Sequence, residues 1–418
     1  MKAILMAVFI GVFYSCSFQN NSTSEDDSVI IPLSTADPSE NISELEKLDA
    51  FISNRKIVAM GEATHGTREF FQMKHRVFRY LVEEKGYRVF LMEATFGECQ
   101  LVNDYLQHGK GTALDALKAM EGNGWQTIEV LEMLKWMRTF NKDRSGNDKI
   151  RFYGFDLIYT KQSTLAFLEF LKIVEPNKVE ELSDKLDDFA ANRLHFYGAS
   201  PSDQQLEKWE NELSPVIEEF ENNEKQYSAK TSEEMYRIAR QNLRVLEQAL
   251  AILKGYDRDE FQAENVKWIM NYEEVDAKAM IWAHNGHISC LSPGRLGYYL
   301  KNSMGDDYYS IGFEFAKGNV LVHKENEYIS RQLSDPLPGS YGEKLCRLKK
   351  PIIFVDFSIL PKNSSIRNTF QGPLLHRHIG VDYGNEADAY RKVSLIKSYD
   401  SIIFIENTNS AIWVNNNI

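Results

Sequence analysis

Two side chains that can exchange protons, Glu62 and His65, lie three apart in the stretch Gly-Glu-Ala-Thr-His-Gly at positions 61–66. The apolar run 57–60 precedes it and a helical pattern follows, which predicts a loop at the carboxyl end of a parallel strand, where open α/β sheets bind ligands. The two glycines are expected to supply backbone angles that a residue with a Cβ resists. A neutral imidazole beside a carboxylate can take a proton from water near pH 7. For this stretch alone, an ordinary turn with a surface histidine is the alternative.

Ionisable side chains also follow three other predicted strands. Glu93 follows 88–92, Asp156 follows 150–155, and His284 and His287 follow 277–283. Because the carboxyl ends of parallel strands meet at one edge of a sheet, we expect all of these side chains to share one rim with Glu62 and His65. Two histidines three apart at a strand end favour a functional role, whereas a lone one would favour a structural role.

The elements that must position these residues form an α/β pattern. A helix is predicted over 67–84, and Lys74 lies on its apolar face, where it either extends to solvent or turns toward the loop above. Helical patterns continue over 97–141, and later strands are predicted over 307–315, 351–357 and 401–405. These patterns predict a mostly parallel central sheet flanked by helices.

A long helical stretch interrupts the strand pattern. Residues 160–275 are nearly all helical in pattern, with a capping box at 231–234 and with Pro215 expected to kink or interrupt one helix. We predict an all-helical insert that covers the active-site cleft, between a first core segment at 45–159 and a second at 276–418. The hairpin-like segment 317–328 suggests no chemistry, and 375–378 is interpreted as a solvated loop with a smaller chance of substrate contact.

The N-terminus indicates export. Residues 1–16 combine Lys2, an apolar run and a final Cys16, which resembles a bacterial lipoprotein signal in which the cysteine is lipidated. The polar segment 17–44 is predicted to be a flexible tether, so the expected location is the bacterial cell envelope, with the membrane reached through the lipid. Simple cleavage or an uncleaved anchor is the alternative.

Composition excludes other classes of protein. The 418 residues carry a formal net charge of −12 with no long basic block, which argues against nucleic-acid binding. Of the four cysteines, Cys99, Cys290 and Cys346 follow Cys16 at spacings that match no zinc or redox motif, and we interpret these three as small core residues.

The residue types on the predicted rim fit activation of water. A Gly-x-Ser-x-Gly motif is absent from the sequence, and none of the three later cysteines is next to a histidine, so a covalent nucleophile is poorly supported. In one mechanism His65 is a general base held by a carboxylate, and His284, His287 or a cation stabilises the oxyanion. In the other, the three histidines and a carboxylate bind a metal such as Zn²⁺. Both predict hydrolysis.

The motifs in combination resemble the erythromycin esterase family. They are Gly-Glu-Ala-Thr-His-Gly at 61–66 followed by Glu69-Phe70, Met-Glu-Ala at 92–94, Arg258-Asp259, and Trp-Ala-His-Asn-Gly-His at 282–287, in the family's order from about residue 45 to 315. In that family a cleft between an α/β core and a helical insert hydrolyses a macrolide lactone ester.

The resemblance implies roles for individual residues. It makes His65 the general base, Glu62 and Glu93 the orienting or active-site carboxylates, and His284 and His287 residues of the cleft. Lys74 stands where the family has a basic residue, often Arg, so a point charge replaces a bidentate fork. Arg258 is the second cation of the cleft, and together with Lys74 and Asp156 it is expected to contact the substrate or the oxyanion.

The resemblance implies a small-molecule ester or lactone as substrate, and it does not require that this be a macrolide. No cofactor is expected, with a divalent metal as the alternative. A non-catalytic surface lipoprotein that binds a ligand is the other hypothesis, and the several titratable groups on one rim argue against it.

Overall fold

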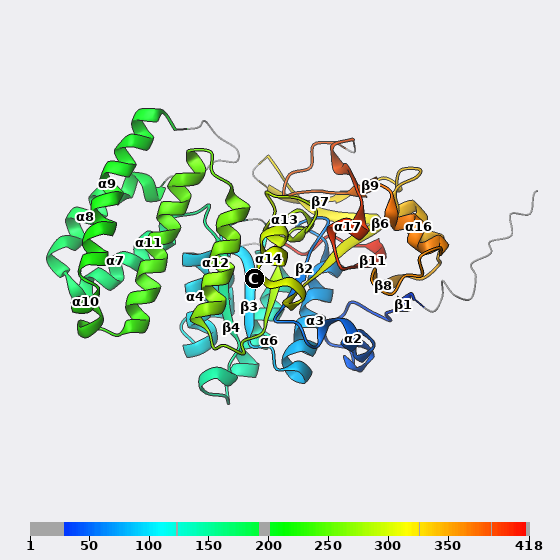
Figure 1. Ribbon diagram of the computed structural model, residues 1–418, viewed down its shortest axis with the longest axis horizontal. Helices are drawn as coiled ribbons and strands as arrows, with labels where there is room; N and C mark the ends of the chain where they lie inside the picture. The colour runs from blue at the N-terminus through cyan, green and yellow to red at the C-terminus, as the bar shows by residue number, and fades with distance from the viewer. Residues whose placement is uncertain (1–28, 123, 192–200, 326, 386, 415–418) are drawn as a thin grey trace, which may run out of the picture.

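A computed structural model describes residues 29–122, 124–191, 201–325, 327–385 and 387–414, and the predicted signal segment with Cys16 lies outside this range. Within it, a nine-stranded sheet has the order β1-β8-β11-β6-β2-β5-β3-β4, with β7 paired to β6. The strands are β1 (Ile31–Pro32), β2 (Ile57–Met60), β3 (Val89–Thr95), β4 (Arg151–Asp156), β5 (Ala279–Trp282), β6 (Tyr308–Lys324), β7 (Glu327–Gln332), β8 (Ile352–Asp356) and β11 (Ser401–Thr408). The strands from β11 to β4 run parallel, which confirms the predicted sheet (Figure 1).

The order of the strands explains why distant motifs meet. β5 lies between β2 and β3 and pairs in parallel with both, so the ends of three strands from separate parts of the chain are neighbours. Every residue of these three strands is buried, as expected of parallel strands covered on both faces. Alternate residues of β2 belong to the two different hydrophobic clusters on opposite faces of the sheet.

Helices cover both faces of the sheet. One cluster includes residues of α3 (Arg68–Lys85), α4 (Phe96–His108), α5 (Ala113–Ala119) and α6 (Ile128–Asn141). The other includes residues of α12 (Arg258–Tyr272), α13 (Asn285–Ile288), α14 (Leu296–Met304), α15 (Tyr341–Cys346), α16 (Ser365–Gln371) and α17 (Leu395–Ser398). Cys99 is buried, Cys290 and Cys346 are partly buried against the second cluster, and all three are free thiols.

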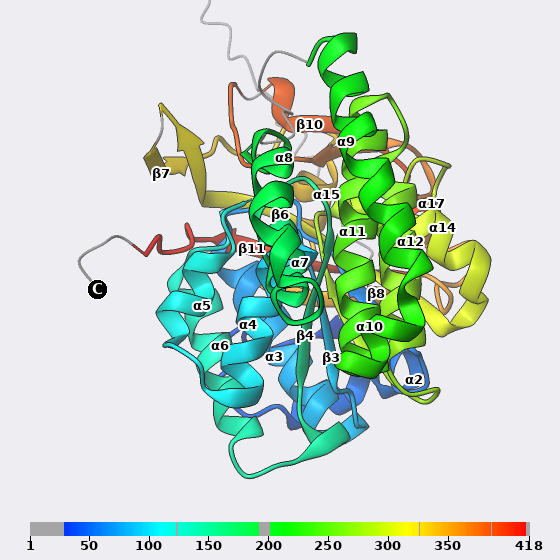
Figure 2. The same ribbon diagram turned by 90° about the vertical axis from the view of Figure 1, so that its left-hand side faces the viewer.

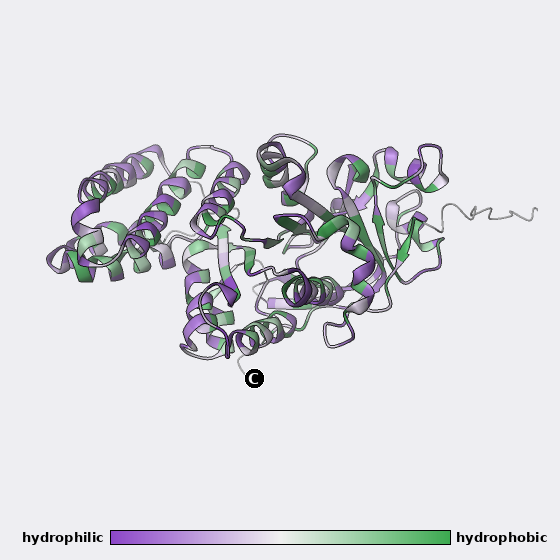
Figure 3. Cartoon of the chain, turned by 60° about the horizontal axis from the view of Figure 1, so that its bottom comes forward, coloured by the Kyte–Doolittle hydropathy of each residue, from purple (hydrophilic) through white to green (hydrophobic). Residues whose placement is uncertain are grey.

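The helical stretch after β4 forms a lobe beside the sheet (Figures 1 and 2). It contains α7 (Lys161–Val174), α8 (Val179–Ala191), α9 (Asp203–Asn222), α10 (Glu224–Lys230) and α11 (Glu233–Leu253), which share a hydrophobic cluster of their own. Hydrophilic and hydrophobic stretches both occur on these helices, as amphipathic helices require (Figure 3). Ser232 caps α11, and α9 runs through Pro215 without the interruption that was one predicted outcome.

The last helix of the predicted insert belongs to the core. Asn265 of α12 donates a hydrogen bond to the Phe155 carbonyl of β4 at 3.0 Å, and Val266 and Ile269 pack in the cluster on one face of the sheet. As a result, α12 connects the lobe to the sheet and carries Arg258 and Asp259 to the rim. In the part of the chain that the structure describes, no helix has the length and apolar character needed to cross a membrane.

The predicted tether is wrong for residues 29–44. β1 pairs with β8 at the edge of the sheet, and Leu33 and Ile42 are buried in the core. The buried Arg76 forms an ion pair with Glu44 at 2.7 Å and donates to the Asn41 carbonyl. The polar composition of the segment concealed a few apolar side chains that suffice to cover a sheet edge.

Candidate active site

His65 and His284 face each other at the carboxyl ends of β2 and β5, with their ring centroids 4.9 Å apart. The backbone N–H of Asn285 donates to the Glu62 carbonyl at 2.8 Å, which ties the two loops together. Glu93 follows from β3, where its carboxylate accepts a hydrogen bond from the His284 backbone N–H at 2.7 Å. The predicted convergence of these strand ends on one rim is therefore observed.

The two glycines of the first loop allow close approach and do not supply unusual backbone angles. Neither Gly61 nor Gly66 has a positive φ. A Cβ on Gly61 would lie 2.1 Å from Asn285 Oδ1, and a Cβ on Gly66 would lie 1.9 Å from the Leu321 carbonyl oxygen. The expected role in backbone conformation is wrong, and the glycines are needed because neighbouring groups contact the loop directly.

Glu62 is the centre of a buried group of donors. Its Oε1 accepts from His65 Nδ1 at 2.7 Å, and its Oε2 contacts the Lys74 ammonium and accepts from Trp282 Nε1 at 2.8 Å. With Nδ1 donating to the carboxylate, the neutral His65 ring carries its lone pair on Nε2. The His65 side chain is 10% exposed, whereas Glu62 and Lys74 are fully buried.

Lys74 turns toward the loop and does not reach solvent. Burial lowers the pKa of Lys74 to about 8, against the opposing effect of the Glu62 charge. Its ammonium also lies 4.3 Å from the centroid of the Trp282 ring. This placement makes it the counter-ion of Glu62, and contact with the substrate stays a prediction.

A second buried ionic group surrounds Glu93. His287 Nε2 lies 3.1 Å from Glu93 Oε1, and its Nδ1 lies 2.9 Å from Asp259. Burial opposes the charged ring, but the two carboxylates outweigh it and raise the pKa of His287 to about 10. The pKa of Glu93 is held well below its usual range by His287, His65 and Arg258, although burial alone would raise it. At neutral pH His287 is an imidazolium with both nitrogens engaged, so it has no lone pair for a proton or a metal.

Arg258 and Asp156 are paired with each other. Arg258 Nε donates to Asp156 Oδ1 at 2.9 Å and its Nη2 contacts Oδ2, while Nη2 lies 3.6 Å from Glu93. Gln262 also donates to Asp156 at 3.1 Å. Together with Glu93, His287 and Asp259, the pair forms a charged layer beneath the rim. Contact of Arg258 or Asp156 with the substrate stays a prediction.

His284 differs from His287 in its protonation. Its Nδ1 accepts a hydrogen bond from the Gly286 backbone N–H at 3.1 Å, so the neutral ring must carry its proton on Nε2. Burial and the neighbouring histidines lower the pKa of His284 well below its ordinary value, which keeps the ring neutral. His284 Nε2 is buried and has no hydrogen-bond partner in the described chain. It is an N–H donor available to a ligand beside His65.

The alternative mechanism requires His65, His284, His287 and a carboxylate to bind one metal ion. Among the residues described, no group of three or more His, Cys, Asp or Glu side chains is arranged to hold a metal ion. In the ligand set suggested by the sequence, His287 is engaged by two carboxylates and His65 Nδ1 by a third. These residues do not fit a shared metal ion in this arrangement.

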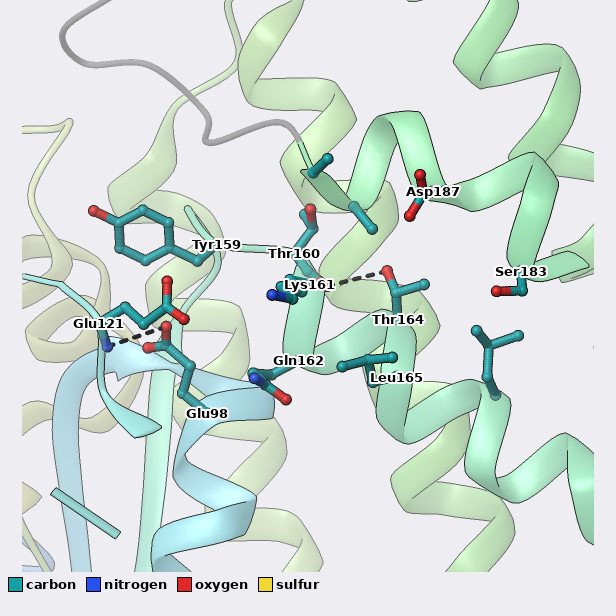
Figure 4. A pocket seen from close by; sticks show the side chains of 13 residues that line it. Glu98, Glu121, Tyr159, Thr160, Lys161, Gln162, Thr164, Leu165, Ser183 and Asp187 are labelled. Atoms are coloured by element: carbon teal, nitrogen blue, oxygen red, sulfur yellow. Dashed lines mark hydrogen bonds between the residues drawn. The ribbon is translucent and has the colours of Figure 1, made fainter. Parts of the chain in front are cut away.

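A pocket of about 410 Å³ opens between the sheet end and the helical lobe (Figure 4). Glu98, in the first turn of α4 after β3, lines it together with Glu121 and Tyr159, and α7 and α8 supply the opposite wall. The Glu121 N–H donates to Glu98 at 3.3 Å, and burial raises the pKa of Glu98 to about 8. Trp125 lies four residues after Glu121 in the sequence, and its ring lies against His65.

The chain is similar to known proteins along most of its length. The erythromycin esterase family model matches residues 82–408. The chain belongs to this family. Erythromycin esterase type II from Escherichia coli is 24% identical over 423 residues, which cover 91% of this chain and 96% of that protein. Membership in the erythromycin esterase family implies ester hydrolysis as the class of reaction.

Solved structures agree in fold. A crystal structure of a Bacillus cereus protein has a TM-score of 0.81 at 23% identity and covers 93% of this chain and 97% of that chain. A mutant of the erythromycin esterase EreC in its open conformation has a TM-score of 0.69 at 15% identity, with 92% and 98% of the two chains covered. The matched range of the erythromycin esterase model begins after His65 and Lys74, so their place in the site comes from the geometry.

Sequence reasoning missed a buried network behind the rim of this erythromycin esterase family member. Residues 375–378 were interpreted as a solvated loop, but β9 (Leu374–Arg377) pairs with β10 (Tyr390–Val393), and His376 and Arg377 are 1% exposed. His376 bonds Glu314 at 2.6 Å and the Asn285 amide at 3.1 Å. That interpretation was wrong because the partners of His376 are remote in sequence.

His378, from the same segment, also belongs to the site. Its ring centroid lies 4.4 Å from that of His284, and burial lowers the pKa of His378 to about 3. The spacing of His376 and His378, two apart, is the one sequence signal that could have indicated a strand here.

The raised pKa of His287 predicts a pH-dependent contribution to stability. A raised folded-state pKa stabilises the fold fully below the unfolded pKa of about 6.5 and loses this effect as pH rises through about 10. We expect H287Q to be less stable than the parent by on the order of 3 kcal/mol at pH 6, with the gap narrowing steadily toward pH 10. Urea unfolding of both proteins at several pH values measures this, and a constant gap would contradict it.

Proposed function

We propose that this protein hydrolyses a carboxylic ester or lactone of a small molecule by attack of a water molecule that His65 activates. One observation carries the proposal: the His65 ring, held by Glu62 at 2.7 Å, lies beside His284, whose Nε2–H has no partner among the described residues. Acyl transfer to water needs these two functions side by side, a group that accepts a proton and a group that donates to the oxygen of the carbonyl.

The proposed reaction proceeds in two stages. His65 Nε2 takes a proton from water as the water oxygen bonds to the carbonyl carbon, and the carbonyl π electrons move to its oxygen, which accepts from His284 Nε2–H. The tetrahedral intermediate then collapses, the bond to the leaving oxygen breaks, and that oxygen takes the proton from His65. Glu62 stabilises the imidazolium formed between these stages, as a carboxylate hydrogen-bonded to Nδ1 does.

The charged layer beneath the rim supports this chemistry without taking part in proton transfer. His287, Asp259, Arg258 and Asp156 are paired among themselves or with Glu93. Glu93 also accepts a hydrogen bond from the His284 backbone N–H at 2.7 Å. The charged layer therefore helps to position the His284 ring, whose Nε2–H is proposed to bind the carbonyl oxygen. The pocket of Figure 4 is lined by Glu121, four residues before Trp125, whose ring lies against His65. We infer that this pocket receives part of the substrate.

A panel assay tests the function. The purified protein and its H65Q variant are incubated with aryl and alkyl esters, lactones and macrolides, and the products are identified by mass spectrometry. Turnover by the parent alone supports the proposal, and equal turnover by the variant would contradict it. Chelator sensitivity with metal analysis separates a metal-dependent hydrolase, and ligand binding without any turnover would favour the non-catalytic surface lipoprotein.

We also propose that the protein is exported and anchored through a lipid on Cys16, on the strength of the apolar leader and its terminal cysteine. With residues 29–44 packed on the core, the tether would be residues 17–28. We expect incorporation of a labelled fatty acid by bacteria that express the full chain, and loss of the label and of membrane sedimentation in C16S. Equal labelling of both proteins would contradict lipidation at this cysteine.

A further inference from the structure

Two buried N–H groups next to His65 lack hydrogen-bond partners. Trp125 is 0% exposed and His284 is 5% exposed. Neither Trp125 Nε1 nor His284 Nε2 has a hydrogen-bond partner within the part of the chain that the structure describes. Buried donors are usually paired, because an unpaired one has lost its hydrogen bonds to water without replacing them. Two unpaired donors on rings beside the proposed base can be satisfied by an acceptor atom of a bound ligand or transition state.

The two rings carrying these donors both contact the proposed base. The Trp125 ring centroid lies 5.3 Å from that of His65, with the planes at 87°, and the His284 centroid lies 4.9 Å from it. An indole N–H is a donor only and does not titrate, so Trp125 can stabilise negative charge without competing for the proton that His65 takes.

The surroundings of Trp125 hold its ring in place. Its ring packs against Trp282 at 5.8 Å and Phe71 at 6.0 Å between centroids. Gly124 before it has φ +76°, and a Cβ there would lie 3.4 Å from the His65 carbonyl oxygen, so the turn fits closely against the loop of the base. A donor fixed in advance needs no reorganisation when charge develops, which is the property required of an oxyanion site.

We propose that Trp125 is a further catalytic residue, whose Nε1–H binds the oxyanion of the tetrahedral intermediate together with His284 Nε2–H. This inference rests on the proposed ester hydrolysis and assigns its second oxyanion donor. The sequence pattern does not single out Trp125, because a tryptophan that follows a glycine-rich stretch is more often a core residue. The competing explanation is that the indole only forms a wall and directs its N–H at an aromatic face.

The test replaces the indole N–H while keeping an aromatic ring. In W125F we expect kcat to fall about 10²-fold, as for loss of one oxyanion donor, with KM changed little. The affinity for a phosphonate monoester, which imitates the tetrahedral oxyanion, should fall in proportion to kcat/KM, while the affinity for the uncleaved amide analogue of the substrate stays the same. W136F is the matched control, because Trp136 of α6 packs against Phe78 of α3, away from the rim.

The outcomes separate this inference from the proposed function. Unchanged kcat and phosphonate affinity in W125F, with H65Q inactive, would overturn the role of Trp125 and leave ester hydrolysis standing. If the parent hydrolyses no ester, the proposed function fails, and equal phosphonate binding by the parent and W125F then overturns the donor role as well. Should W125F fold poorly, benzothienylalanine at position 125 keeps the bicyclic shape without the N–H and must give the same losses.

Discussion

We expect H65Q to lose activity by about 10³-fold or more in kcat/KM, because general base catalysis alone contributes up to about 10⁴-fold and glutamine cannot take a proton. The glutamine amide can still donate to Glu62, which contacts the His65 ring at 2.7 Å, so the loop should keep its fold. The variant should therefore melt close to the parent and bind the phosphonate, while hydrolysis of the best ester of the panel is lost.

The controls for H65Q come from the same chain. His108 is exposed at the end of α4, and H108Q should be as active as the parent. A parallel loss in both variants would point to a general effect of the exchange. Activity of H65Q within about tenfold of the parent would mean that another group activates water, since a positioned base contributes at least about 10²-fold. His378 and His284 would be the first candidates, because their rings lie 4.4 Å apart beside His65.

The strand-end rim was predictable because it depends on a rule of topology. An apolar run followed by Glu62, Glu93 or His284 places each residue at a carboxyl end, and parallel strands bring these ends to one edge. The pattern of apolar runs along the chain does not predict the order of the strands in the sheet. That β5 inserts between β2 and β3 follows from pairing across more than 180 residues of chain, and this insertion places His284 beside both His65 and Glu93.

The residues that were missed or misjudged depend on partners remote in sequence. His376 is buried because Glu314 and Asn285 satisfy both of its nitrogens, and nothing local to 375–378 shows this. Asp259 was noted in a motif without a role, and together with Glu93 it raises the pKa of His287. Nothing in the sequence around Trp125 distinguishes it from a core tryptophan, and it is its N–H, unpaired among the described residues, that does so.

The orientation of Lys74 also depends on contacts that are remote in sequence, and its substitution should cause a large loss of stability. Its position on the apolar face of α3 left two orientations open, and the structure places its ammonium on the fully buried Glu62 carboxylate. We expect K74M to destabilise the fold by about 3–5 kcal/mol, because removing one partner leaves an uncompensated buried charge. Urea unfolding measures this change, and K135M, in which an exposed lysine of α6 is exchanged, should be neutral within about 0.5 kcal/mol.

A double variant separates the effect of Lys74 on stability from its effect on the chemistry. In K74M/E62Q both charges are absent, so most of the lost stability should return, since replacing a whole buried pair is often close to neutral. The double variant should nevertheless lose about 10²-fold or more in kcat, because His65 no longer has a carboxylate to stabilise its imidazolium. A K74M protein as stable as the parent would show that Glu62 is neutral in the fold. It could then not serve His65 as an anionic partner, and the assignment of the base would have to be revised.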